Sequence, residues 1–176
     1  MAITARASAR QARASLREAG LVLASTGRPF SPAAIDLAAG LAKAAGSRVR
    51  VVTIARIHGS AFGLQHPGLM PNKKERAAAE LVVADAIRAL HKQGLAADGE
   101  VVITRSPGPA FARAARSAGT VTHVIVDEAR GGRWGRLTAG GTARTVMLRV
   151  KGAVVNVVAG GVVSHALSPR RSRTGT

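Results

Sequence analysis

Residues 124–142 read VIVDEARGGRWGRLTAGGT and carry three local signals in succession. Residues 124–126 are apolar and β-branched, which favours a buried strand. The residues that follow are rich in glycine and arginine, as in a loop. Gly141-Thr142 is expected to begin a helix, whose free backbone N–H groups and dipole attract anions. The stretch therefore predicts a strand, a basic loop and a helix that together favour a bound phosphate.

The alternation of strand and helix extends to both sides of this stretch. Apolar runs of strand length fall at residues 21–24, 49–54, 101–104, 123–126 and 153–158. Helices are expected from Ser31-Pro32 to Gly46, from Asn72 to Gly94, from Pro109 to Ala118, and from Gly141 to about Arg149. Strict alternation requires parallel strands joined by right-handed crossovers. The sequence predicts an α/β fold in which an open five-stranded parallel sheet carries helices on both faces.

Two of these helices carry clear sequence signals. Ser31 can cap the first helix, and a proline after it suits the first helical position. In the second helix an apolar stripe is expected to face the core, formed by Leu81, Ala84, Ile87 and Leu90 with Val83 beside it.

Composition bounds the partners and the chemistry. The 176 residues hold 26 basic and 9 acidic side chains, a net charge of +17, which attracts nucleic acid and nucleotides alike. There is no cysteine, so disulfides and thiolate chemistry are excluded. No apolar run reaches the roughly 20 residues of a membrane helix, and no secretory signal is recognised. We expect a cytoplasmic protein that has no membrane partner.

The chain divides into three parts by pattern. Residues 1–19 form a basic N-terminal extension rich in alanine and arginine, and residues 20–160 carry the alternating strands and helices of one domain. Residues 161–176 are expected to be a disordered basic tail, because 164–176 show no core-forming pattern.

Several stretches resemble the universal stress protein family. Residues 106–126, SPGPAFARAARSAGTVTHVIV, are similar to its third helix and fourth strand, and residues 141–158, GTARTVMLRVKGAVVNVV, to its last helix and strand. The family's pattern after the fourth strand is Gly, two residues, Gly, nine residues, Gly, then Ser or Thr. Gly131, Gly141 and Thr142 fit it, whereas Glu128 stands at the first glycine. The resemblance implies strand order 3-2-1-4-5, as in adenine-nucleotide alpha hydrolase-like folds, and a role in the stress response.

The resemblance also implies a nucleotide site and a homodimer. Its candidate nucleotide-binding residues are Ser25, Thr26, Ile54, Gly131, Arg133, Gly141 and Thr142, with ATP as the possible ligand. Ser25-Thr26 stand where ATP-binding members usually have an Asp. Weak, salt-sensitive nucleotide binding is therefore expected, better for phosphate than for adenosine. The family often pairs through its last strand, and residues 153–158 would otherwise form an exposed apolar edge.

Other functions are less favoured by the sequence. The five histidines lack ligand-like spacing, so no metal site is predicted. No catalytic residue is predicted either, because no set of residues for base catalysis or phosphoryl transfer can be assembled. The alternative reading is a basic module that binds nucleic acid through phosphate contacts from loop and tails. Against it, the aromatic residues number only four and are scattered.

Overall fold

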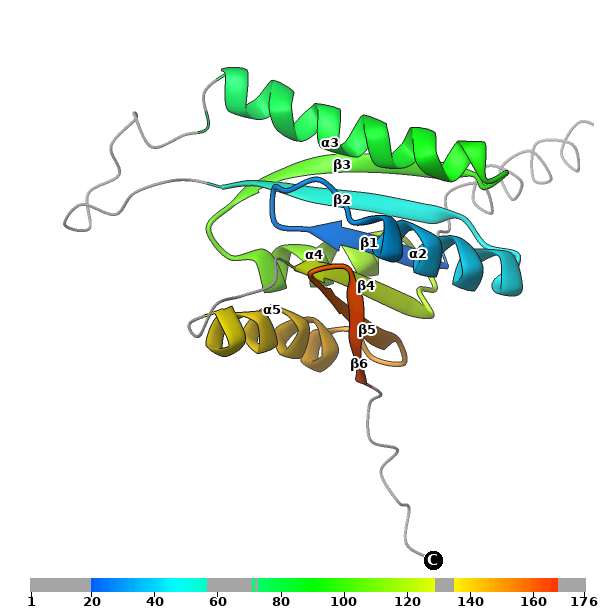
Figure 1. Ribbon diagram of the computed structural model, residues 1–176. Coiled ribbons are helices and arrows are strands. Elements are labelled where there is room, and N and C mark those ends of the chain that lie inside the picture. Colours follow the sequence, from blue (N-terminus) through cyan, green and yellow to red (C-terminus); the bar gives the residue numbers. More distant parts are fainter. Residues whose placement is uncertain (1–19, 57–70, 72, 129–134, 168–176) are drawn as a thin grey trace, which may run out of the picture.

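The computed structural model describes residues 20–56, 71, 73–128 and 135–167. They form a sheet covered by helices on both faces (Figure 1). The strands are β1 (Leu21–Ser25), β2 (Val49–Arg56), β3 (Ala97–Thr104), β4 (His123–Glu128), β5 (Val154–Ala159) and β6 (Val162–Leu167). The helices are α2 (Pro32–Ala45), α3 (Lys73–Lys92), α4 (Pro107–Ser117) and α5 (Gly135–Arg149).

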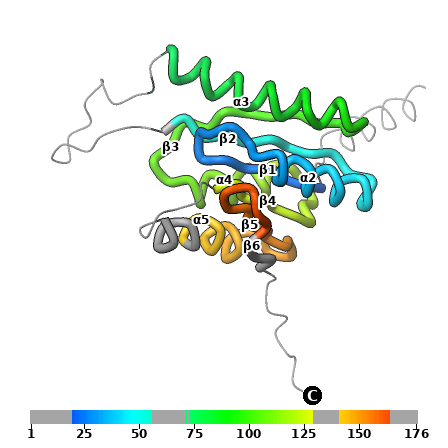
Figure 2. The backbone as a smooth tube through the Cα atoms, viewed as in Figure 1, coloured from blue at the N-terminus to red at the C-terminus, as the bar shows by residue number. Residues whose placement is uncertain are grey.

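The strand order is β3-β2-β1-β4-β5-β6, with β1 at the centre beside β2 and β4 (Figure 2). Strands β1 to β5 pair in parallel, so the predicted order 3-2-1-4-5 is confirmed. Leu21 lies level with Val49 on one side and with His123 on the other. The order reverses between β1 and β4, and in open α/β sheets the ligand crevice lies at such a point, beyond the carboxyl ends of the strands.

Strand β6 was not predicted, and it corrects two expectations. It pairs antiparallel with β5, after a turn through Gly160 and Gly161, whose φ values are +58° and +79°. Residues 162–167 are therefore a strand and not the start of a disordered tail at residue 161. Because β6 occupies the outer side of β5, residues 153–158 are not the open sheet edge from which a homodimer was inferred.

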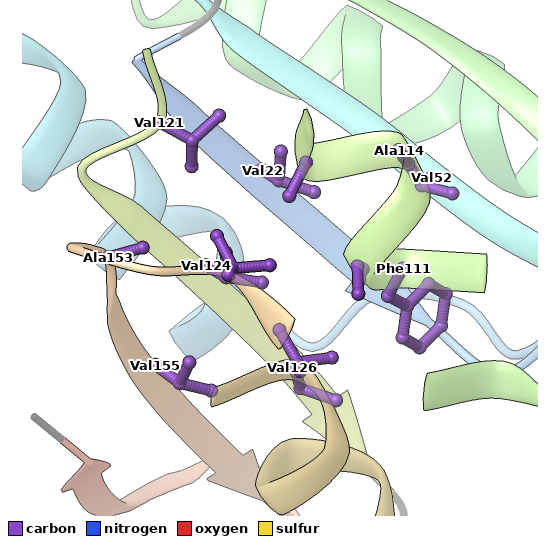
Figure 3. Packing of buried hydrophobic residues seen from close by; sticks show 14 of the residues in the cluster. Val22, Val52, Phe111, Ala114, Val121, Val124, Val126, Ala153 and Val155 are labelled. Atoms are coloured by element: carbon purple, nitrogen blue, oxygen red, sulfur yellow. The ribbon is translucent and has the colours of Figure 1, made fainter. Parts of the chain in front are cut away.

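Each face of the sheet has its own apolar core. Helices α4 and α5 cover one face, where Phe111 is fully buried among valines and alanines (Figure 3). Helices α2 and α3 cover the other face, over Leu21, Leu23 and Ile125. Strands buried on both faces read as continuous apolar runs, which is the pattern the sequence shows. The two layers hold the carboxyl ends of β1, β2 and β4 in fixed positions.

Helix α2 begins and ends as the sequence predicts. The Ser31 hydroxyl accepts a hydrogen bond from the Ala34 N–H at 3.3 Å, and Gly46 ends the helix with φ +58°. Ser31→Ala should therefore lower the free energy of unfolding by about 1 kcal/mol, measured by urea denaturation. Ser106→Ala is the matched control, because Ser106 precedes α4 without a side-chain capping bond. Equal losses in both variants would contradict the assignment.

The core-facing side of α3 matches the predicted one only in part: Val83 and Leu90 are buried and Ile87 packs against the core, as expected. Ala79, Val83, Ala86 and Leu90 are buried, whereas Leu81 is 61% exposed and Ala84 is exposed. The predicted stripe followed the larger apolar residues. Beside Val83 and Leu90, the helix buries Ala79 and Ala86, which were not predicted, in place of Leu81 and Ala84.

Candidate functional site

The loop after β1 is held to β2 by a hydroxyl network. Ser25 is 1% exposed, and its Oγ lies 2.9 Å from Oγ1 of Thr53 on β2. The same Ser25 hydroxyl donates to the Arg28 carbonyl oxygen at 2.8 Å, and the Gly27 N–H donates to Thr53 Oγ1 at 3.2 Å. Ser25, a predicted site residue, is therefore buried, and its hydroxyl holds the backbone of the loop in place.

Gly27 allows this loop to approach β2 closely. Its φ is +85°, and a Cβ built there would lie 2.5 Å from the Ile54 carbonyl oxygen. A side chain at this position would meet backbone, which cannot swing aside as a flexible side chain can. The sequence interpretation did not identify Gly27. Its only signal is a glycine two residues after a buried strand.

A pocket of about 450 Å³ opens between the β1 loop, the end of β2 and helix α3, and we call it the β1–β2 pocket. Its lining is Thr26, Gly27, Pro29, Ile54, Ala55, Glu75, Ala78, Ala79 and Val82. The structure thus brings two predicted site residues, Thr26 and Ile54, into one cavity. The α3 wall is mainly alanine and valine, and the sequence interpretation did not identify it.

A second pocket, of about 290 Å³, lies on the other side of the same loop, and we call it the β4 pocket. It is lined by Arg28, Pro29, Ser31, Asp127, Glu128, Gly160 and Gly161. Pro29 lines both pockets. The β4 pocket lies at the reversal of strand order, and the turn between β5 and β6 forms one of its walls.

The Asp127 side chain is hydrogen-bonded to the residue that caps helix α2. Its Oδ2 accepts a hydrogen bond from the Ser31 N–H at 2.6 Å. Burial raises the pKa of the Asp127 carboxyl, while the Ser31 hydrogen bonds and the Arg28 charge act in the opposite direction. A carboxylate that accepts from a helix N-terminus is a favourable arrangement. Asp127 therefore has a structural partner.

Glu128 has no such partner at one of its oxygens. The residue is 9% exposed, and its Oε2 makes no hydrogen bond to any residue in the described part of the chain. Burial, and to a smaller extent the neighbouring Asp127 charge, raise the pKa of the Glu128 carboxyl to about 7. Near neutral pH this carboxyl is poised between its neutral and its charged form.

The predicted helix start at Gly141-Thr142 is wrong. Helix α5 begins at Gly135, so both residues lie within the helix, and Gly141 is exposed with no neighbour near a built Cβ. Their backbone N–H groups are consequently not the free donors of a first turn. The Thr145 hydroxyl donates to the Gly141 carbonyl at 2.7 Å. The likewise predicted Gly131 and Arg133 lie outside the described residues.

Two searches give negative findings for the described residues. No group of three or more His, Asp or Glu side chains is placed to hold a metal ion in the described ranges. No helix among the described elements has the length and hydropathy needed to cross a membrane.

Sequence comparison alone does not place the chain. No protein-family model matches it, and no curated protein has a significantly similar sequence. Solved structures do match. A universal stress protein from Archaeoglobus fulgidus in complex with dAMP superposes with a TM-score of 0.55 at 18% identity, covering 81% of this chain and 98% of that one. The chain has the fold of the universal stress proteins.

Further structures with this fold cover a similar share of the chain. A universal stress protein in complex with cAMP gives a TM-score of 0.53 at 16% identity, over 80% of this chain and 97% of that one. A protein of the universal stress protein family from Burkholderia pseudomallei gives a TM-score of 0.55 at 19% identity, covering 79% of this chain and 95% of that one. The fold implied by the sequence resemblance is confirmed. This chain adds to the predicted five-stranded core the antiparallel strand β6.

Proposed function

We propose that this chain is a non-catalytic universal stress protein domain that acts in the stress response by binding an adenine nucleotide. The β1–β2 pocket carries the proposal, because it gathers Thr26 and Ile54 at the carboxyl ends of two parallel strands. Two solved proteins of the same fold are described as complexes with dAMP and cAMP, which supports a nucleotide as the ligand class. A cytoplasmic location belongs to the same proposal.

The pocket suits a base better than a phosphate. Ile54, Ala55, Ala79 and Val82 offer apolar contact, and the volume of about 450 Å³ lies in the range of small-molecule sites. The phosphate would then extend toward residues 129–134, which contain Arg130 and Arg133, and toward the first turn of α5. We propose ATP as a ligand of this kind, with Gly131 and Arg133 of that segment as phosphate contacts, whereas Gly141 and Thr142 lie inside α5 and are no longer proposed.

Filling the pocket from α3 tests the proposal. Ala78 lines the pocket and is exposed, so Ala78→Phe should occupy the cavity without disturbing the core. We expect the affinity for AMP and ATP, measured by calorimetry, to fall by about tenfold or more, equivalent to 1.4 kcal/mol. Ala77→Phe is the matched control, because Ala77 is exposed on the same helix and does not line the pocket.

The nucleic-acid alternative gives a different result in the same variants. Charge-driven binding to single-stranded DNA weakens steeply with salt and does not depend on the pocket. If wild type binds DNA but no nucleotide, and Ala78→Phe and Ala77→Phe bind DNA as wild type does, the proposed function is wrong. Nucleic-acid binding by a basic module then replaces it.

A further inference from the structure

A buried carboxyl group at the site has no assigned role. Glu128 ends β4 beside the reversal of strand order and lines the β4 pocket, while Asp127 next to it is engaged by the Ser31 N–H. Glu128 is 9% exposed, and its Oε2 lacks a donor among the described residues. A charged carboxylate in that position is costly unless it is paired. Its neutral form avoids most of that cost.

The residues around Glu128 do little to offset the cost of a buried negative charge. The other charged groups that line the pocket are Asp127 from β4 and Arg28 from the loop after β1, and the β5–β6 turn supplies only glycines. On the sheet face covered by α4 and α5, the described core side chains of these helices are apolar. Among the described residues, the charge that shifts the pKa of the Glu128 carboxyl is that of Asp127, and it disfavours ionisation of Glu128.

The β4 pocket adjoins the proposed nucleotide site. Pro29 lines both pockets, so the loop after β1 borders each of them. The chain leaves β4 at Glu128 and enters the arginine-rich residues 129–134, which precede α5. A nucleotide whose base occupies the β1–β2 pocket would place its phosphate at this same edge of the sheet. A negative charge on Glu128 opposes a phosphate there.

We infer that Glu128 sets the charge specificity of this site, because binding of an anionic nucleotide is coupled to protonation of its buried carboxyl. The inference rests on the proposed function. The neutral carboxyl does not repel the phosphate, and its O–H can donate a hydrogen bond to a phosphate oxygen. Anionic nucleotides therefore bind more tightly as the pH falls, whereas a neutral nucleoside is indifferent to the state of Glu128.

Cyclic AMP is the sharpest probe. As a phosphodiester it lacks the second ionisation that phosphomonoesters show near pH 6, so its own charge stays constant between pH 6 and pH 8. For wild type we expect calorimetry to show affinity about tenfold weaker at pH 8 than at pH 6, the factor given by one coupled proton with a pKa between them. Titrations in buffers of different ionisation enthalpy should show proton uptake at pH 7.

Glu128→Gln is the control for charge, since it keeps the shape and removes the ionisation. This variant should bind cAMP as tightly at pH 8 as at pH 6, because every other titratable group is the same in both proteins. Adenosine should bind with the same affinity at both pH values. If cAMP binding changes equally in wild type and variant, or no proton is taken up, the inference is wrong while the nucleotide site stands. If neither cAMP nor adenosine binds at any pH, the proposed function is wrong and the inference is overturned with it.

Discussion

Replacing Glu128 by Gln should raise the free energy of unfolding at pH 8 by about 2–3 kcal/mol, and by less than about 1 kcal/mol at pH 5. The native pKa of about 7 lies above the ordinary value of 4.5. The native state therefore holds its proton more strongly than the unfolded chain does. The stability that protonated Glu128 contributes is fully present below about pH 4.5 and is lost as the pH rises through 7.

Urea denaturation of wild type and variant at several pH values between 5 and 8 measures this difference. The two stability curves should separate as the pH rises. Glu80→Gln is the matched control, because Glu80 is exposed on α3 and the same change there removes a solvated carboxylate. A constant difference between wild type and Glu128→Gln across this range would contradict the assignment of a buried, protonated carboxyl.

Local signals predicted most of the elements correctly. Ser31, Pro32 and Gly46 set the ends of α2 through capping and backbone preference, which depend on few neighbours. Parallel pairing followed from the alternation of strands and helices, and the order of strands from the family resemblance. Features that depend on packing were predicted less well. The buried side of α3 consists partly of Ala79 and Ala86, whose small side chains give a weak amphipathic signal.

The errors near the end of the chain have physical causes too. Gly160-Gly161 between two apolar runs is a hairpin signal, but residues 162–167 are short and mix apolar with polar side chains. Helix α5 begins at Gly135 although its first seven residues include three glycines, which disfavour a helix by propensity. In both places contacts with β5 and with the sheet outweigh the local preference.

The site was predictable only where the family resemblance reached it. Thr26 and Ile54 were identified from their place at strand ends, and they line one pocket. Ala78 and Val82, on the opposite wall, come from helix α3, and nothing in the sequence links them to β1. The unpaired oxygen of Glu128 is likewise a tertiary property, because it depends on what surrounds the end of β4.

Gly27→Ala should cost the domain about 3 kcal/mol of unfolding free energy and disrupt nucleotide binding. A φ of +85° is strained for any residue with a Cβ, and the added atom would lie 2.5 Å from the Ile54 carbonyl oxygen. Relief requires the loop or β2 to move, which widens the contact between them. Both segments line the β1–β2 pocket, so its shape must change with them.

Gly46→Ala separates backbone strain from the steric clash. Gly46 has φ +58°, and a built Cβ there meets nothing within 4 Å. In this control the free energy of unfolding should fall only by the cost of the left-handed conformation, about 1 kcal/mol. The variant should bind nucleotide as wild type does. Thermal or urea unfolding of both variants, followed by AMP titration, gives the comparison. The larger loss at Gly27 would measure how strongly the close approach of the β1 loop to β2 constrains the pocket, and equal losses would show that this contact contributes nothing to the fold or the site.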